Sequence, residues 1–206
     1  MRSVPVLRIL LLALSAGVAA SCSDSSAPPD DSRPPADLSV VHVAASSTPL
    51  FNPTVSFYAK RGEDREARIY FQDETGGQGE EYVRLRVNAN SLLATPDGLP
   101  IPPGDSVLIT MSVVDPTEML FDMQPTGLTF SPLAPAELKI HYDHANGDLN
   151  DDGTTDSRDS TIEQTLAIWR QENLGDPFVR LTSVLVIESD EADAELTGFS
   201  RYALAY

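Results

Sequence analysis

The acidic stretch from Asp148 to Asp159 carries the strongest pattern of chemistry-bearing residues in the sequence. It reads Asp-Leu-Asn-Asp-Asp-Gly-Thr-Thr-Asp-Ser-Arg-Asp. Counted from Asp148, oxygen-bearing side chains occupy positions 1, 3, 5, 9 and 12, and position 6 is Gly153. Alternate residues of a tightly turned loop point inward, and glycine permits the sharp turn. The pattern predicts a cage of hard oxygen atoms, which suits Ca²⁺ because this ion takes about six to eight oxygen ligands.

This spacing resembles the calcium loop of EF-hand proteins, with aspartate in place of glutamate at position 12. The resemblance implies that Thr154 contributes its main-chain carbonyl and that calcium is held by Asp148, Asn150, Asp152, Thr154, Asp156 and Asp159. The final aspartate resembles the dockerin version of the loop, although a dockerin has two loops and this chain has one. The entering helix is also missing, because residues 140–142 read as a strand. The alternative is a charged, solvated turn that binds no ion.

Other groups of reactive residue types are thinner. His141 and His144 lie three residues apart, but no third ligand stands at metal-like spacing, so surface histidines are favoured over a zinc site. The carboxylate pairs Glu80–Glu81 and Asp190–Glu191 are expected in turns, where they would be solvated. The sequence has no Gly-x-Ser-x-Gly elbow and no phosphate-binding glycine loop. We therefore expect no enzymatic activity.

Apolar residues at every second position predict the strands that must carry these groups. In residues 107–113 the alternating set is Val107, Ile109, Met111 and Val113. In residues 138–142 the apolar set is Leu138, Ile140 and Tyr142, and the residues between them are polar. Strands are expected at residues 40–44, 55–59, 67–72, 82–87, 107–113, 138–142, 166–170, 178–187 and, as one or two strands, 194–206.

Turn residues separate these short strands, and few segments have helical spacing. Ile162, Leu166 and Trp169 keep a helical period, so a short helical turn is expected before the strand near Leu166. Trp169 and Tyr202 are expected to pack in or around the core. Many short strands without alternating helices predict an all-β fold, an antiparallel β-sandwich of immunoglobulin-like or related type.

The N-terminal segment has the features of an export signal. Arg2 and Arg8 precede an apolar run over residues 9–20, which is shorter than the roughly 20 residues of a membrane-spanning helix. Small residues lead to Cys22, the only cysteine, as in a bacterial lipoprotein. We predict a signal peptide at residues 1–21 and a lipid on Cys22. The alternative is a free thiol in a soluble secreted product.

The remaining chain divides into two parts. Residues 22–37 are rich in proline, serine and aspartate, and they are predicted to form a disordered tether. Residues 38–206 are predicted to form the β-sandwich domain, with the calcium loop as an insert at residues 143–159. A single cysteine excludes a disulfide framework. The net charge of −17 excludes nucleic acid as a partner, because the field would repel phosphate.

Four short motifs occur in the order of a known family. They are Ile101–Gly104 (Ile-Pro-Pro-Gly), Pro125–Phe130 (Pro-Thr-Gly-Leu-Thr-Phe), Pro135–Leu138 (Pro-Ala-Glu-Leu) and Phe199–Leu204 (Phe-Ser-Arg-Tyr-Ala-Leu). From Glu81 to Tyr206 the chain resembles the ZU-type β-sandwich domain of ankyrins, netrin receptors and bacterial surface lipoproteins. Asp105 departs from the family's usual alanine, and the acidic loop interrupts its pattern. The resemblance implies a role in attachment or assembly.

These observations lead to one functional expectation and one rival. We expect a membrane-anchored, extracytoplasmic lipoprotein of the bacterial cell envelope that serves as a structural or binding module with one calcium ion. Its partners would be the membrane, through Cys22, and a cell-surface protein or glycan. The rival is an extracytoplasmic enzyme or glycan-active accessory protein whose site has no linear motif. A subunit of a surface assembly that pairs through an open sheet edge is a further alternative.

Overall fold

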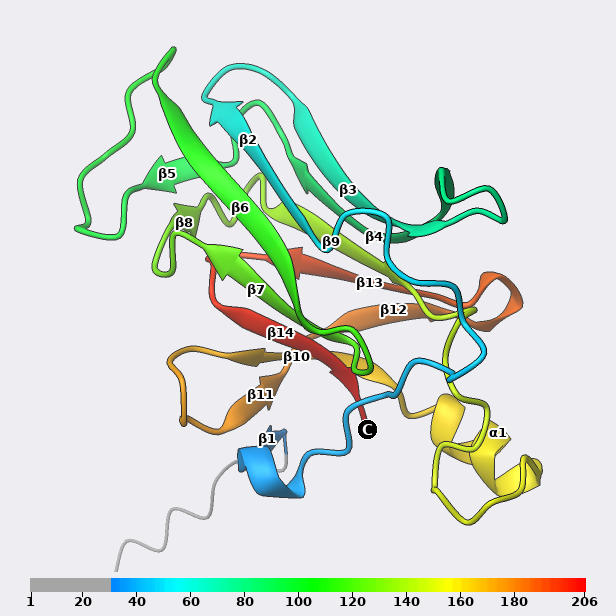
Figure 1. The fold of residues 1–206 in the computed structure, drawn as a ribbon. Coiled ribbons are helices and arrows are strands. Elements are labelled where there is room, and N and C mark those ends of the chain that lie inside the picture. The colour runs from blue at the N-terminus through cyan, green and yellow to red at the C-terminus, as the bar shows by residue number, and fades with distance from the viewer. Residues whose placement is uncertain (1–30) are drawn as a thin grey trace, which may run out of the picture.

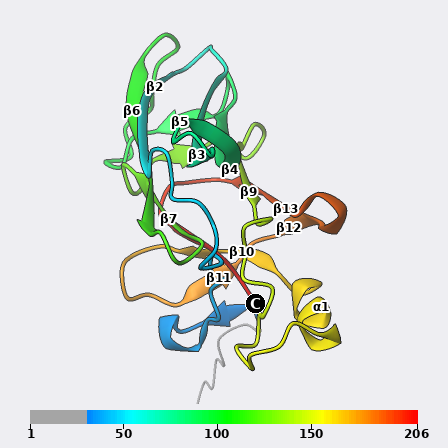
Figure 2. The ribbon, with the colours of Figure 1, turned by 45° about the vertical axis from the view of Figure 1, so that its right-hand side comes forward.

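The structure is a computed structural model and describes residues 31–206. The predicted signal peptide and the lipid attachment at Cys22 lie outside the described residues. Two antiparallel sheets face each other, and Figures 1 and 2 show them from two directions. In residues 31–206 no helix has the length and apolar character needed to cross a membrane. The predicted all-β sandwich is confirmed.

The strands have the following order across each sheet. The larger sheet contains β1 (Ser32–Arg33), β11 (Phe178–Arg180), β10 (Ala167–Gln171), β14 (Arg201–Ala205), β7 (Leu120–Gln124), β6 (Ser106–Asp115) and β2 (Thr54–Lys60). The smaller sheet contains β12 (Ser183–Val186), β13 (Glu191–Leu196), β9 (Ala136–His141), β4 (Gln78–Val87) and β3 (Arg65–Gln72). A small third sheet pairs β5 (Leu92–Ala94) with β8 (Thr129–Phe130).

Alternating side chains of both sheets meet in the main core. In β4, Val83 and Leu85 are fully buried, whereas Arg84 lies on the outer face, as their spacing predicts. The ring of Tyr82 lies 4.7 Å from the ring of Phe71 in β3 and 5.3 Å from that of Phe121 in β7. The contact between Tyr82 and Phe121 therefore joins the two sheets.

A second, smaller cluster lies on the outer face of the larger sheet. Trp169 of β10 and Ala203 of β14 point away from the main core, and the N-terminal segment covers them with Leu38. The indole Nε1 of Trp169 donates to the carbonyl of Ala205 at 3.1 Å. The chain from residue 31 onward is thus part of the folded domain.

The predicted tether boundary is wrong for its last residues. Ser32 and Arg33 pair with β11, and a 3₁₀ turn spans Pro35–Asp37, so the domain begins before Leu38. Two paired residues are too short to show a periodic sequence pattern. Residues 22–30 of the predicted tether lie outside the described residues.

Three local predictions also need correction. The strand expected at residues 178–187 is split between the sheets, because β11 ends at Arg180 in the larger sheet and β12 begins at Ser183 in the smaller one. Residues 40–44 form only isolated bridges. Glu80–Glu81 lie in β4 rather than in a turn, and Glu191 begins β13. The remaining predicted strands are present, and residues 194–206 contribute to two.

The acidic insert joins the two sheets. It leaves β9 of the smaller sheet and reaches β10 of the larger one through a single α-helix, α1 (Ser157–Glu163). The predicted helical turn near the acidic loop is therefore confirmed. In Figure 1 the insert, α1, β1 and the C-terminus lie at one end of the sandwich, and β5 and β8 lie toward the other.

Candidate metal centre

The first half of the acidic loop is a tight turn closed by its own side chains. The carboxylate of Asp148 accepts hydrogen bonds from the main-chain N–H of Asp152 at 3.1 Å and of Gly153 at 2.8 Å. The side-chain oxygen of Asn150 accepts from the same Asp152 N–H at 2.9 Å. Gly153 has φ +88°, a conformation that glycine adopts without steric cost. The sharp turn predicted at Gly153 is therefore present, and the side chains at positions 1 and 3 are bonded to main-chain N–H groups of the loop.

The second half of the loop is the start of α1. Asp156 is the N-cap, and its carboxylate accepts from the N–H of Arg158 at 2.7 Å. Asp159 completes a capping box by accepting from the N–H of Asp156 at 2.7 Å. The loop therefore ends in a helix that begins at position 10.

Asp159 also reaches back to the beginning of the loop. Its carboxylate is buried and accepts from the N–H groups of Leu149, at 2.8 Å, and Asn150, at 3.3 Å. The N–H of Asp156 is the main cause that lowers the pKa of this carboxyl below its ordinary value, and the other two N–H groups add to it. Asp159, at position 12, is therefore favoured as an anion, and its carboxylate connects the beginning of the loop to its end.

The loop is attached to the body of the domain through Leu149 and Tyr206. The Tyr206 hydroxyl, just beyond β14, donates to the main-chain carbonyl of Leu149. The Leu149 side chain packs against the main core. A change in the conformation of the loop would therefore act directly on the last strand.

The predicted ligands are close in the chain, but their carboxylates do not converge on one point. Asp152 accepts from the hydroxyl of Thr154 at 2.6 Å, which is the main cause that lowers its pKa, and it pairs with Arg158 at 3.3 Å. No three of the loop's aspartate side chains have ligand atoms within 4.8 Å of one another. Main-chain N–H groups and Arg158 hold these carboxylates in the structure.

One group of acidic and histidine side chains does converge in residues 31–206. Glu80, Asp143 and His144 each offer a ligand atom within 4.8 Å of the others, so they could hold a metal ion. His144 Nε2 lies 2.9 Å from a Glu80 oxygen and 3.7 Å from an Asp143 oxygen. Burial is the main cause that raises the pKa of Asp143; Glu80 raises it further, and His144 opposes the shift.

Sequence reasoning missed this group because it treated Glu80 and His144 separately. Strands β4 and β9 pair with Val83 opposite Ile140. If the register is continued by three residues, Glu80 comes to lie opposite Asp143, beside His144. The signal was therefore present in the two strands, but it requires knowledge of which strands pair.

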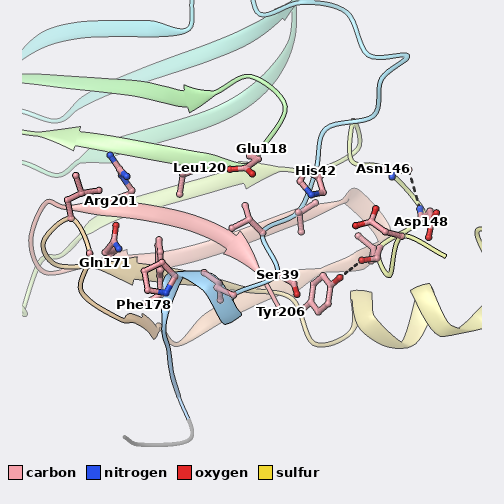
Figure 3. A pocket seen from close by; sticks show the side chains of 18 residues that line it. Ser39, His42, Glu118, Leu120, Asn146, Asp148, Gln171, Phe178, Arg201 and Tyr206 are labelled. Atoms are coloured by element: carbon pink, nitrogen blue, oxygen red, sulfur yellow. Dashed lines mark hydrogen bonds between the residues drawn. The ribbon is translucent and has the colours of Figure 1, made fainter. Parts of the chain in front are cut away.

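A groove of about 510 Å³ lies beside the acidic loop (Figure 3). The N-terminal segment, the turn between β10 and β11, and the loop form its walls. Arg201 and Gln171 lie toward one end, and Asn146 and Asp148 lie toward the other. The groove is thus basic at one end and acidic at the other.

Comparison with known protein families, with curated proteins and with solved structures finds no match to this chain. The fold and the site define a class on their own: an antiparallel β-sandwich with an acidic and histidine group that could bind a metal. A particular function must be inferred from the chain's own residues.

Proposed function

We propose that this chain is a lipid-anchored binding module of the bacterial cell envelope, with one calcium ion in the loop from Asp148 to Asp159. The observation that carries the proposal is the closed loop. Asp148 accepts from the N–H groups at positions 5 and 6, and Asp159 joins the start of the loop to the start of α1. In a calcium loop of this spacing alternate oxygen atoms point inward, and here the ion would draw the carboxylates together.

Calcium would relieve the concentration of negative charge in the loop. Four of the six proposed ligands are aspartates, and among the described residues Arg158 is the only cationic side chain that pairs with one of them. Coordination of a shared ion by these carboxylates would replace their mutual repulsion with attraction to the ion. Thr154 would supply its carbonyl, and Asn150 its amide oxygen.

The groove supports the binding role. Asp148 and Leu149 belong both to the loop and to the groove wall, so an ion in the loop would fix one side of the groove. Its mixture of charged and aromatic side chains, including Arg201 and Phe178, suits a cell-surface protein or a glycan as partner. A ZU-type kinship is part of this proposal, since such domains act in attachment.

A glycan-active enzyme is the second candidate, and one observation favours it. The carboxylates of Glu118, Asp148 and Asp151 line the same groove, as acid and base groups of such an enzyme would. Turnover of a polysaccharide that is abolished by Glu118→Gln would support this candidate. A groove that binds a glycan without turning it over would support the binding module.

Thermal unfolding in chelator and in millimolar calcium tests the calcium site. A lone loop is expected to bind with Kd of roughly 0.1 to 1 mM, so millimolar calcium should add about 1 kcal/mol of stability. For a domain of this size that raises Tm by about 2–4 °C. Magnesium should have a smaller effect, because it dehydrates reluctantly.

The variants make this experiment specific. Asp148→Ala with Asp152→Ala should lose the calcium shift. Asp97→Ala with Asp105→Ala removes the same charge from exposed positions outside the loop and should keep it. Equal Tm values with and without calcium in the parent would contradict the proposal, and so would an equal shift in the loop variant.

A further inference from the structure

We propose that Glu80, Asp143 and His144 form a separate site for Zn²⁺, independent of the calcium loop and of the membrane anchor. The three side chains come from two places in the chain, β4 and the turn that follows β9. The set combines one imidazole nitrogen with two carboxylates, which is a donor set that zinc accepts and that calcium and magnesium do not favour.

The turn that carries two of the ligands is fixed by main-chain contacts. The N–H of Ala145 donates to the carbonyl of Tyr142 at 2.8 Å and closes the turn. The carbonyl of His144 accepts from the N–H of Ala44 at 2.8 Å and from the hydroxyl of Ser47 at 3.2 Å. Asp143 and His144 are thus held in place before any ion arrives.

Stacking orients the imidazole. The rings of His144 and Phe71 are stacked, with centroids 3.9 Å apart and an interplanar angle of 27°. In this orientation Nε2 points toward the carboxylates of Glu80, at 2.9 Å, and Asp143, at 3.7 Å. Ligands bound to zinc at about 2.0–2.1 Å in a tetrahedron lie about 3.3 Å apart, so the two observed distances bracket the required one.

The charge of the group favours a divalent cation. Among the described residues, His144 contacts both Glu80 and Asp143, and no lysine or arginine pairs with either carboxylate. A proton on His144 would compensate one negative charge, whereas Zn²⁺ would compensate both. The Glu80 side chain is 71% exposed, which leaves room for water as a fourth ligand.

The neighbouring histidine provides a matched control. His141 also contacts two carboxylates, with Nε2 3.3 Å from Glu81 and Nδ1 3.7 Å from Glu191. Its two ring nitrogens face different carboxylates. A metal ion bound to one nitrogen would therefore reach only one of the two carboxylates. His141 therefore represents an imidazole that lies beside carboxylates but has no convergent set of three ligands.

The experiment is a calorimetric titration of tag-free, chelator-treated protein with Zn²⁺ at neutral pH. We expect one saturable site in the parent, and the same site in Asp148→Ala with Asp152→Ala. His144→Phe keeps the ring stacked on Phe71 but removes the nitrogen. It should weaken zinc binding by at least the roughly 10- to 100-fold that loss of an outer-shell partner costs. Asp143→Asn should also weaken it, and His141→Phe should not.

Cobalt binding supplies a second measurement, which is read from absorption and not from the heat of binding. Co²⁺ in a tetrahedral nitrogen and oxygen site gives visible absorption, which should appear in the parent and disappear in His144→Phe. Unfolding curves in chelator verify that each variant is folded. The absence of a saturable zinc site in the parent would overturn the proposal. Binding that survives His144→Phe, or that His141→Phe weakens equally, would overturn it too.

Discussion

Glu191 is a carboxylate whose environment makes its ionisation matter for stability. Lys139 Nζ donates to it at 2.5 Å, and this hydrogen bond is the main cause that lowers the pKa of Glu191 below its ordinary value. His141 and Arg84 add positive potential. The anion is therefore favoured by the folded state, and its contribution is complete above the ordinary glutamate pKa of about 4.3.

Glu191→Gln should consequently reduce stability most at neutral pH. As pH falls below about 4.3 and through the lowered folded-state pKa, the parent loses this contribution, so the gap between the two proteins should close. Urea midpoints from pH 3 to 7 measure the gap. Glu195→Gln, at an exposed position of the same strand, is the control and should give a smaller gap. A gap for Glu191→Gln that is constant over this range would contradict the assignment.

Tyr206 is the second residue with a defined role, because its hydroxyl connects the last strand to the acidic loop. Tyr206→Phe leaves the Leu149 carbonyl without this donor and should cost about 1 kcal/mol in the free energy of unfolding. It should also reduce the calcium-dependent Tm shift, since the loop would be less firmly attached. Tyr58→Phe, at a 64% exposed position in β2, should change neither quantity.

At the scale of elements, the N-terminal segment acts as a cover for the outer face of the larger sheet. Leu38 is buried against Trp169 and Phe178. Leu38→Ala should cost about 2 kcal/mol or more and expose the indole. Because Trp169 is the only tryptophan, its emission should shift to longer wavelength. Leu133→Ala, at a position that is 95% exposed, should leave stability and emission unchanged.

Strands with a clear alternating pattern were predictable, and pairing between distant strands was not. The spacing of Val83, Leu85 and Val87 defines an inward face without knowledge of any partner. By contrast, β1 has two residues, and its existence depends on Val179 and Phe178 lying opposite. The break at Leu181 depends on which sheet each half joins, and this is decided by tertiary packing.

The two candidate metal centres differ in the same way. The acidic loop is encoded in consecutive residues, so the turn at Gly153 follows from local spacing, whereas the N-cap at Asp156 was not predicted and α1 ends before Leu166 and Trp169, on which the predicted helical turn was based. The group around His144 requires β4 and β9 to pair in one particular register. Local hydrogen bonds can be read along the chain, whereas a site between strands needs the sheet.

At the scale of the whole molecule, membrane attachment is expected to depend on Cys22, which lies outside the described residues. Cys22→Ser should move the protein from the membrane pellet to the soluble fraction, because serine has no thiol to carry the lipid that is predicted to anchor the mature chain. Fractionation of cells that express each form measures this. A variant that remains in the pellet as fully as the parent would contradict the lipoprotein assignment.

The position of β1 has a mechanical consequence for a domain attached through its N-terminus. A load between the membrane and a bound partner would enter the domain at Ser32–Arg33 and act first on their pairing with β11. That strand has only two residues, so it should detach at low force, and Leu38 would then become the next point of resistance. The N-terminal segment would lengthen by a few residues while the sandwich stayed folded. Extension of this segment would therefore absorb part of a sudden load before it reached the core strands.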